Sequence, residues 1–287
     1  PAIKQQANLI FLVDRVDALA APHYARNDLL MHVESIRQRI AGYRDQYFAP
    51  QLIDAFLESS RRESFWLLLE PRSIQAYLQD LLAHGERKRA GLAELKQLAE
   101  IFSRIVDAKS PFTGAHSLGV ARLARLLGER FNLPRSRCDM IEIAGLLHDL
   151  GKLRVPDEIL DKPSQLDAEE RMVINTHSFE TYQILRNIQG FEEIAPWAAY
   201  HHEEPDGNGY PFHLNGAELP LEARILRVAD IFQAMVQNRP YRSGLSAIEA
   251  MAFMRKLEAQ GRVEPAILSM LAIDPEHVRK VALSQHQ

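Results

Sequence analysis

The feature that most constrains the fold is the spacing of apolar residues, which recur every three or four positions along nearly the whole chain. This spacing gathers them on one face of an α-helix. It predicts helices over residues 3–19, 29–40, 51–57, 74–82, 92–108, 118–131, 138–147, 168–185, 193–201, 221–237, 247–257 and 265–271. No window sustains the alternation typical of a strand, so we predict an all-α protein.

Residues at the expected helix starts support this interpretation. Ser136 precedes the helix expected from residue 138, and Ser246 precedes the one expected from 247. Both are residue types that cap helices by accepting a backbone N–H. Pro220 stands at the entry to the helix expected from 221, where a fixed φ is favourable.

A weak internal repeat suggests how the chain is divided. Residues 10–19 align with 226–235 around Asp14 and Asp230, and residues 49–57 align with 264–272 around Pro50 and Pro265. The separations are 50 − 14 = 36 and 265 − 230 = 35 residues. We interpret the first copy as a degenerate half repeat, although two amphipathic helices and a proline-capped third can match by chance.

The repeat leads to three expected parts: an N-terminal helical segment (1–62), a connecting helix and hinge (63–94) and a catalytic domain (95–287). Residues 83–91 are polar, charged and flanked by glycine, as is typical of an exposed hinge. Trp66 and its apolar neighbours are expected to pack between domains. The first copy carries only His23 and His32, so we expect it to be structural, packing on the second copy or forming a homodimer.

Composition excludes several classes of function. The formal charge is −4, so no nucleic-acid polymer is expected as a partner, and any anionic ligand needs local positive charge. Cys138 is the single cysteine, which rules out an internal disulfide and fits a reducing, cytoplasmic location. No apolar run approaches the roughly 20 residues that span a bilayer. The chain begins with Pro1, which we interpret as the start of a fragment.

Ionisable residues interrupt the apolar run at 144–153, which contains His148, Asp149 and Lys152. An unpaired buried charge is costly, and a metal ion removes that cost because imidazole and carboxylate are its usual ligands. A carboxylate with two oxygens can also bridge two ions. The alternative is a hydrogen-bonded pair or cap at a helix end, with Gly151 stopping the helix.

Other residues with metal-binding side chains lie on apolar helices or at their ends. His116 starts one expected helix, His177 lies within another, His201 and His202 end a third, and Asp230 lies inside an apolar run. A lone histidine on an apolar face is usually a satisfied core residue. Five histidines and two aspartates without a common partner would cost several kcal/mol on burial, about 2–7 kcal/mol for each unsatisfied group, which favours a shared metal site.

The order of these motifs resembles the HD-GYP family of bacterial phosphodiesterases, a branch of the HD metal-dependent phosphohydrolases. The likeness covers about residues 95–275. It rests on His116, the run from His148 to Lys152, His177, the run from His201 to Pro211 that contains Gly209 and Tyr210, the run from Arg224 to Asp230, and the run from Asn238 to Arg242. The resemblance implies an HD-type helical bundle that hydrolyses cyclic di-GMP or a related cyclic dinucleotide.

The resemblance also implies a ligand set for two metal ions. Asp149 bridges them. The first ion is held by His116, His148, Asp149 and Asp230, and the second by Asp149, His177, His201 and His202. Some members bind a third ion through a glutamate four residues before the first histidine. This sequence has Phe112 there, so we expect two ions, with iron or manganese favoured by the mixed ligands.

The implied reaction is attack of a metal-bridging hydroxide on phosphorus, giving the linear dinucleotide and potentially GMP. Asp149 and Lys152 are the expected catalytic residues. Lys152, Arg239, Arg242 and Tyr210 are the expected substrate contacts, because charged side chains and an arginine fork suit phosphate.

The Gly-Tyr-Pro loop either faces the substrate or only braces His201 and His202. In related proteins it is also proposed to dock a cyclase-domain partner. Asp206, at the start of the loop, is expected to hydrogen-bond a ligand imidazole, since such ligands usually have a second partner.

The sequence departs from the family pattern at Ser110, Gly119, Thr181 and Pro205. These differences bear on substrate choice and loop shape. They keep open a second hypothesis, a weak or inactive receptor that binds a cyclic dinucleotide and signals through partners. A third hypothesis is an HD-type nucleotidase, for which the Gly-Tyr-Pro loop, Arg239 and Arg242 would have no use.

Overall fold

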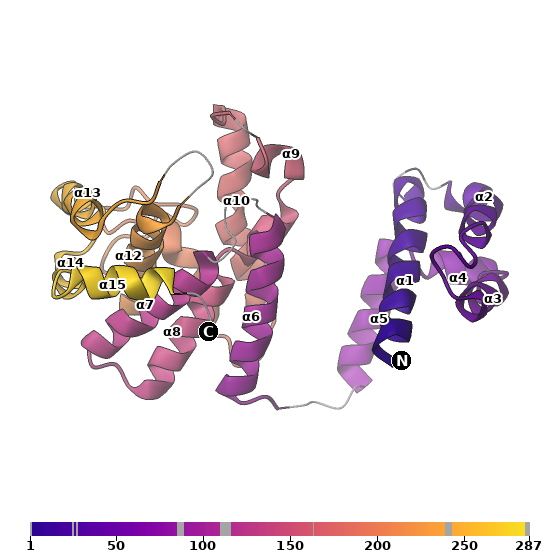
Figure 1. Cartoon of the computed structure of the whole chain (residues 1–287), viewed down its shortest axis with the longest axis horizontal. Helices are drawn as coiled ribbons and strands as arrows, with labels where there is room; N and C mark the ends of the chain where they lie inside the picture. The colour runs from indigo at the N-terminus through magenta and orange to yellow at the C-terminus, as the bar shows by residue number, and fades with distance from the viewer. Residues whose placement is uncertain are drawn as a thin grey trace. The chain divides into compact units, whose positions relative to one another are not determined.

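The computed structural model describes residues 2–24, 26, 28–84, 89–109, 116–162, 164–238 and 243–284. Within these ranges every regular element is a helix, which confirms the all-α prediction (Figure 1). The chain divides into two compact units, Pro1–Lys88 and Arg89–Gln287.

The first unit contains α1 (Ala2–Tyr24), α2 (Leu29–Ala41), α3 (Pro50–Ser59), α4 (Glu63–Leu67) and α5 (Pro71–His84). Its core joins apolar residues such as Val16, Ile40 and Ile53. Trp66 is fully buried there, stacks edge-on against Phe56 and donates its Nε1–H to the Ser60 carbonyl. The expectation that Trp66 packs between domains is therefore wrong, because this ring fills the core of the unit that carries it.

The second unit contains α6 (Leu92–Lys109), α7 (His116–Arg130), α8 (Arg135–Leu147), η1 (Leu150–Arg154), α9 (Asp157–Leu160), α10 (Ala168–Leu185), α11 (Ile194–Ala199), η2 (Tyr200–His202), α12 (Leu221–Val236), α13 (Ala247–Ala259), α14 (Pro265–Leu271) and α15 (Pro275–Leu283). Helix α7 packs against both α8 and α12. Leu123 and Leu127 of α7, Ile141 of α8 and Phe232 of α12 are fully buried in the shared core.

The observed helix starts test the capping residues that the sequence predicted. Ser246 caps α13 in a reciprocal arrangement with Glu249, as predicted. Helix α8 begins earlier than predicted, at Arg135, and Pro134 precedes it. Ser136 therefore lies inside the helix, and its assignment as a cap is wrong because the fixed φ of Pro134 already starts the turn.

The predicted helices all occur, while α4, α9, the 3-10 helix η1 and α15 were not predicted. The first two are shorter than two turns, and periodicity cannot identify so short a helix. Pro50 and Pro265 each begin a helix, as the repeat expects. Duplication and the boundaries at residues 62 and 94 stay predictions. Among the described helices, none combines the length and apolarity that a bilayer crossing requires.

Candidate metal centre

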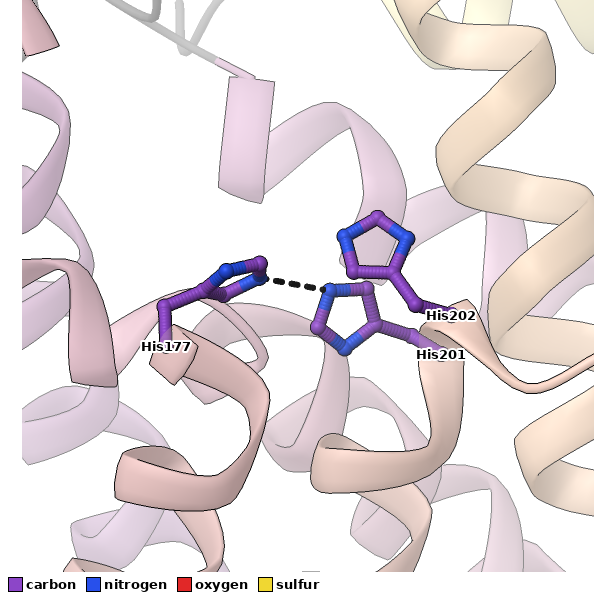
Figure 2. A group of neighbouring side chains, drawn as sticks. All are labelled: His177, His201 and His202. Atoms are coloured by element: carbon purple, nitrogen blue, oxygen red, sulfur yellow. Dashed lines mark hydrogen bonds between the residues drawn. The ribbon is translucent and has the colours of Figure 1, made fainter. Parts of the chain in front are cut away.

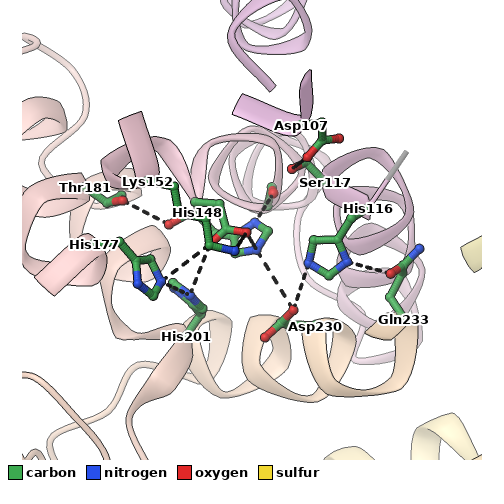
Figure 3. Close-up of polar contacts among 12 residues, drawn as sticks. Asp107, His116, Ser117, His148, Lys152, His177, Thr181, His201, Asp230 and Gln233 are labelled. Carbon is green, nitrogen blue, oxygen red and sulfur yellow. Dashed lines mark hydrogen bonds and ion pairs between the residues drawn. The ribbon is translucent and has the colours of Figure 1, made fainter. Parts of the chain in front are cut away.

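All seven residues proposed as metal ligands lie together in the second unit, although they come from separate elements. His116 begins α7, His148 follows α8, Asp149 precedes η1, and His177 lies in α10. The remaining three are His201 and His202 in η2 and Asp230 in α12. Figure 3 shows side chains from these elements pointing toward one another.

On one side of the cluster, His116, His148 and Asp230 present three ligand atoms within 4.8 Å of one another. His116 Nε2 lies 3.0 Å from Asp230 Oδ1, and His148 Nε2 lies 4.0 Å from the same oxygen. Donor atoms about 2.0–2.2 Å from one metal ion lie three to four Å apart, so this spacing suits one ion.

On the other side, His177, His201 and His202 form a second group with the same limit of 4.8 Å (Figure 2). His177 Nε2 and His201 Nε2 are 3.3 Å apart. Three imidazoles at this spacing suit a second transition-metal ion.

Asp149 lies between the two groups and directs one oxygen to each. Its Oδ2 is 3.3 Å from His148 Nε2, and its Oδ1 is 3.4 Å from His177 Nε2 and 4.0 Å from His201 Nε2. The carboxylate is almost fully buried. Asp149 is therefore the residue through which the two groups form one centre.

Backbone contacts orient three of the imidazoles. The Nδ1 atoms of His148, His177 and His201 each lie 2.6–2.7 Å from the carbonyl oxygen three residues earlier. A carbonyl accepts only from N–H, so Nδ1 carries a proton, and in the neutral form of each ring Nε2 keeps its lone pair. His148 Nε2 is buried, and its 3.3 Å approach to Asp149 Oδ2 does not have the geometry of a hydrogen bond. A buried atom of this kind needs a partner, and a metal ion fits that need.

The electrostatics favour neutral imidazoles on one side of the centre. Burial lowers the pKa of His177 to about 4 and holds the pKa values of His201 and His202 well below the ordinary value. These three side chains are neutral at pH 7, which is the form that binds metal.

The carboxylates of the centre are ionised, and they raise the pKa of His148. Burial opposes ionisation of Asp149 and Asp230, but the neighbouring histidines, joined at Asp149 by Lys152, outweigh it and lower both pKa values. Burial also opposes the charge on His148, yet Asp149 and Asp230 raise its pKa to about 9. The two buried carboxylates are therefore paired with cationic neighbours, and a bound metal ion can take the place of the His148 proton.

Gln233 of α12 contacts a proposed ligand, and the sequence did not reveal this contact. Its Oε1 lies 2.6 Å from His116 Nδ1 and is buried, so it accepts from this nitrogen and turns Nε2 toward Asp230. Gly119 makes room for this contact. A Cβ at position 119 would lie 2.7 Å from Gln233 Nε2 and 2.5 Å from the Ala282 carbonyl, which explains why no larger residue stands there.

Thr181 of α10 also supports the centre. Its hydroxyl donates to the His148 carbonyl at 3.0 Å and accepts from the Gly151 N–H at 2.9 Å. The threonine, one of the departures from the family pattern, thus fixes the turn between α8 and η1. Gly151 is not a simple helix stop. A Cβ there would lie 2.0 Å from the His177 carbonyl, so glycine permits the close approach of η1 to α10.

The structure places two of the four expected substrate contacts. Lys152 donates to Asp149 Oδ2 at 2.6 Å, so its ammonium lies at the centre. The Tyr210 ring stacks on His202 with centroids 4.7 Å apart. Arg239 and Arg242 lie outside the described residues, as do Phe112 and Ser110.

The loop that carries Tyr210 is held by a carboxylate that the sequence did not single out. Glu203 is buried and accepts the Phe212 N–H at 2.7 Å and the Leu214 N–H at 2.9 Å. Asp206 is exposed and accepts the Asn208 N–H within its own turn. For four of the five imidazoles the acceptors are Gln233 and backbone carbonyls, so the expectation that Asp206 orients one of these four is wrong.

Comparison with known proteins relates this site to others. The sequence model of one family, described as HD domain, matches residues 100–267. A 3′3′-cGAMP-specific phosphodiesterase of Vibrio cholerae is 32% identical over 98% of this chain and 66% of its own length. A cyclic di-GMP phosphodiesterase response regulator of Xanthomonas campestris is 35% identical over 59% of this chain and 43% of its own.

A solved structure of a cyclic GMP-AMP specific phosphodiesterase from V. cholerae is also similar, with 30% identity and a TM-score of 0.47. It covers 89% of this chain and 58% of that one. This chain spans 66% of the length of the first of these relatives and 49% of another 3′3′-cGAMP-specific phosphodiesterase of V. cholerae.

Proposed function

This chain belongs to the HD domain family, and on that premise we propose that it is a metal-dependent phosphodiesterase that opens a cyclic dinucleotide. The product is the linear dinucleotide, which the same centre can hydrolyse on to GMP. The proposed cofactor is a pair of divalent ions, iron or manganese.

The observation that carries the proposal is the position of Asp149 between two histidine groups, with one carboxylate oxygen directed to each. A purely structural cluster of this size would hydrogen-bond its own polar atoms, whereas the 3.3 Å contact of His148 Nε2 with Asp149 Oδ2 lacks hydrogen-bond geometry, and no other described residue hydrogen-bonds this atom. Two ions sharing Asp149 are the arrangement that hydrolyses phosphodiesters in many enzymes.

In this proposal His116, His148, Asp149 and Asp230 hold one ion, and Asp149, His177, His201 and His202 hold the other. Bound divalent ions supply Lewis acidity toward a phosphoryl oxygen and lower the pKa of water. Gln233 and the backbone carbonyls keep the lone pairs of the imidazoles directed inward.

Lys152 brings a positive charge to the edge of the centre through its contact with Asp149, where it can meet a substrate phosphate. Tyr210, stacked on His202, presents an aromatic face beside the same imidazole. Aromatic faces stack on nucleobases, so this ring suits a nucleotide substrate. Arg239 and Arg242 are proposed as further phosphate contacts from the sequence alone.

The names of the relatives support the substrate class. One acts on 3′3′-cGAMP and another on cyclic di-GMP, according to their descriptions. We propose cyclic di-GMP or 3′3′-cGAMP as the substrate. We also propose that the protein is soluble and cytoplasmic and acts on the free dinucleotide. A cyclase-domain partner at the Gly-Tyr-Pro loop and a homodimer also remain proposals.

The test is hydrolysis of both dinucleotides by the chain loaded anaerobically with iron or manganese, with products separated by chromatography. Loss of a residue that only hydrogen-bonds a metal ligand typically lowers activity by about 10- to 100-fold. Asp149 is a proposed ligand itself, so Asp149→Asn is expected to lower the rate of hydrolysis by more than this. Asp157→Asn is the matched control, because Asp157 is exposed and pairs with Lys109 away from the centre.

A loaded protein that leaves both dinucleotides intact contradicts the proposal. In that case binding of labelled dinucleotide to the chain, with and without metal, tests the alternative of a receptor. Binding that survives Asp149→Asn and metal removal would favour the receptor.

A further inference from the structure

A second group of metal-binding side chains lies in the N-terminal unit, apart from the centre described above. It consists of His23 near the end of α1, Asp28 just before α2 and His32 in the first turns of α2. The three ligand atoms lie within 4.8 Å of one another, and all three residues are half-buried. Nothing in the proposed phosphodiesterase reaction uses them.

The Asp28 carboxylate faces both imidazoles. His23 Nδ1 lies 2.8 Å from Oδ1, and His32 Nε2 lies 3.6 Å from Oδ2. An aspartate at this position usually accepts a backbone N–H of the helix it precedes. Asp28 makes no such side-chain cap, so its carboxylate is turned from the helix toward the histidines.

A hydrogen-bonded pair of His23 and Asp28 explains only part of this geometry. The distance from His32 to Asp28 is too long for a hydrogen bond. The two imidazole rings nevertheless stack with centroids 3.8 Å apart and planes inclined by 21°. His32 thus lies beside the pair through this ring stack and an ion pair with Asp28, and no hydrogen bond joins it to Asp28.

A metal ion explains the position of all three residues. Nitrogen and oxygen donors bind zinc at about 2.0–2.2 Å, so neighbouring donors in a tetrahedral site lie about 3.3–3.6 Å apart. The separation of His32 Nε2 from Asp28 Oδ2 already has this value.

We propose that His23, Asp28 and His32 bind one divalent transition-metal ion of the zinc type, with water in the remaining position. Two imidazoles and a carboxylate are a ligand set for zinc, copper or nickel rather than for magnesium or calcium. The ion joins the C-terminal end of α1 to the start of α2. Its effect is to stabilise this corner of the N-terminal unit.

The test measures zinc bound per full-length chain by equilibrium dialysis at buffered free zinc, followed by elemental analysis. His32→Ala is expected to bind one zinc fewer per chain than the unmodified protein, and Asp28→Asn at least tenfold more weakly at this site. His84→Ala is the matched control, because His84 is an exposed histidine with an aspartate, Asp80, four residues earlier and 3.8 Å away. It should bind as much zinc as the unmodified chain.

A second readout identifies the site directly. Zinc is expected to shift the imidazole resonances of His23 and His32, including in a His177→Ala/His201→Ala chain whose other centre is impaired. Shifted resonances in that chain would support the zinc site even if the proposed phosphodiesterase activity were not found. Equal zinc content in the His32→Ala and unmodified chains, with unshifted resonances, overturns the proposal and leaves a hydrogen bond between His23 and Asp28 only.

Discussion

At the scale of single residues, the contact between Gln233 and His116 decides which nitrogen of that imidazole is available. Gln233 Oε1 can only accept, so the proton lies on Nδ1 and the lone pair on Nε2 faces Asp230. Leucine at position 233 has a similar volume and no acceptor, which would free the ring to rotate or to change its tautomer.

We therefore expect Gln233→Leu to lower metal affinity at the centre by about 10- to 100-fold. Gln233→Glu keeps an oxygen acceptor and should recover most of the affinity. Metal titration followed by elemental analysis measures both, with Gln183→Leu on α10 as the control. Equal loss in the leucine and glutamate variants would indicate a packing defect instead of a lost acceptor.

Glu204 shows a different role for a buried charge. It accepts hydrogen bonds from Arg227 at 2.6 Å and from Arg262 at 2.8 Å, and both Glu204 and Arg227 are nearly fully buried. Burial opposes its ionisation, but the two guanidinium groups outweigh this effect and lower the pKa of Glu204 below 4.5. The ionised carboxylate therefore stabilises the fold.

Glu204→Gln should reduce the free energy of unfolding by about 3 kcal/mol at pH 7, because Arg227 is left buried without a counter-charge. A lowered pKa means that this stabilisation is present above pH 4.5 and is lost as the pH falls through the folded-state pKa. The difference between variant and parent should thus shrink in acid.

Urea unfolding at neutral and acidic pH measures this difference. Glu129→Gln, at an exposed pair with Arg125, should change stability by no more than about 1 kcal/mol at any pH. A difference for Glu204→Gln that does not change with pH would show that its charge is not responsible.

At the scale of elements, the centre depends on how closely η1 approaches α10. Gly151 is the residue that permits this approach, because a Cβ would lie 2.0 Å from the His177 carbonyl. Thr181 then ties α10 to the turn through the His148 carbonyl. These contacts set the distance between Asp149 and His177.

Gly151→Ala is expected to cost about 2–3 kcal/mol of stability through overpacking, and to lower metal content by moving Asp149 from His177. Gly128→Ala is the matched control in α7. Its Cβ would meet its nearest neighbour at 3.4 Å, so it should be neutral or stabilising by up to about 1 kcal/mol. Chemical denaturation and metal analysis of both variants measure the effect, and full metal content in Gly151→Ala would contradict it.

At the scale of the whole molecule, metal binding at the centre around Asp149 should stabilise the second unit, because its proposed ligands come from five parts of that unit. A ligand that binds only the folded state adds about 2.7 kcal/mol when its free concentration is 100 times the Kd. The chain has two tryptophans, Trp66 in the first unit and Trp197 in the second, and both are buried. Each can report on its own unit.

In a Trp66→Phe chain, which keeps only the Trp197 signal, a chelator is expected to lower the Tm reported by fluorescence. The same treatment of a Trp66→Phe/His177→Ala/His201→Ala chain should have a much smaller effect. An unchanged Tm in the chain that keeps its histidines would contradict metal binding at the proposed centre.

The sequence by itself determined the helical class, the positions of the longer helices and the family. Periodicity identifies amphipathic helices because burial of one face leaves a regular pattern, and separated motifs in a fixed order identify a family. The residues named as ligands also lie together in the structure, although their binding of metal remains a prediction. The short helix α9 was missed because four residues carry too little pattern.

Only the tertiary structure decided which side chains support one another. Gln233 and His116 are separated by 117 positions, and His148 and Thr181 by 33. The sequence places His23 and His32 in a unit expected to be structural, and the structure brings them together with Asp28 between the end of α1 and the start of α2. Periodicity shows which face of a helix is buried and not which helix covers it, so partners distant in the chain are fixed by packing alone.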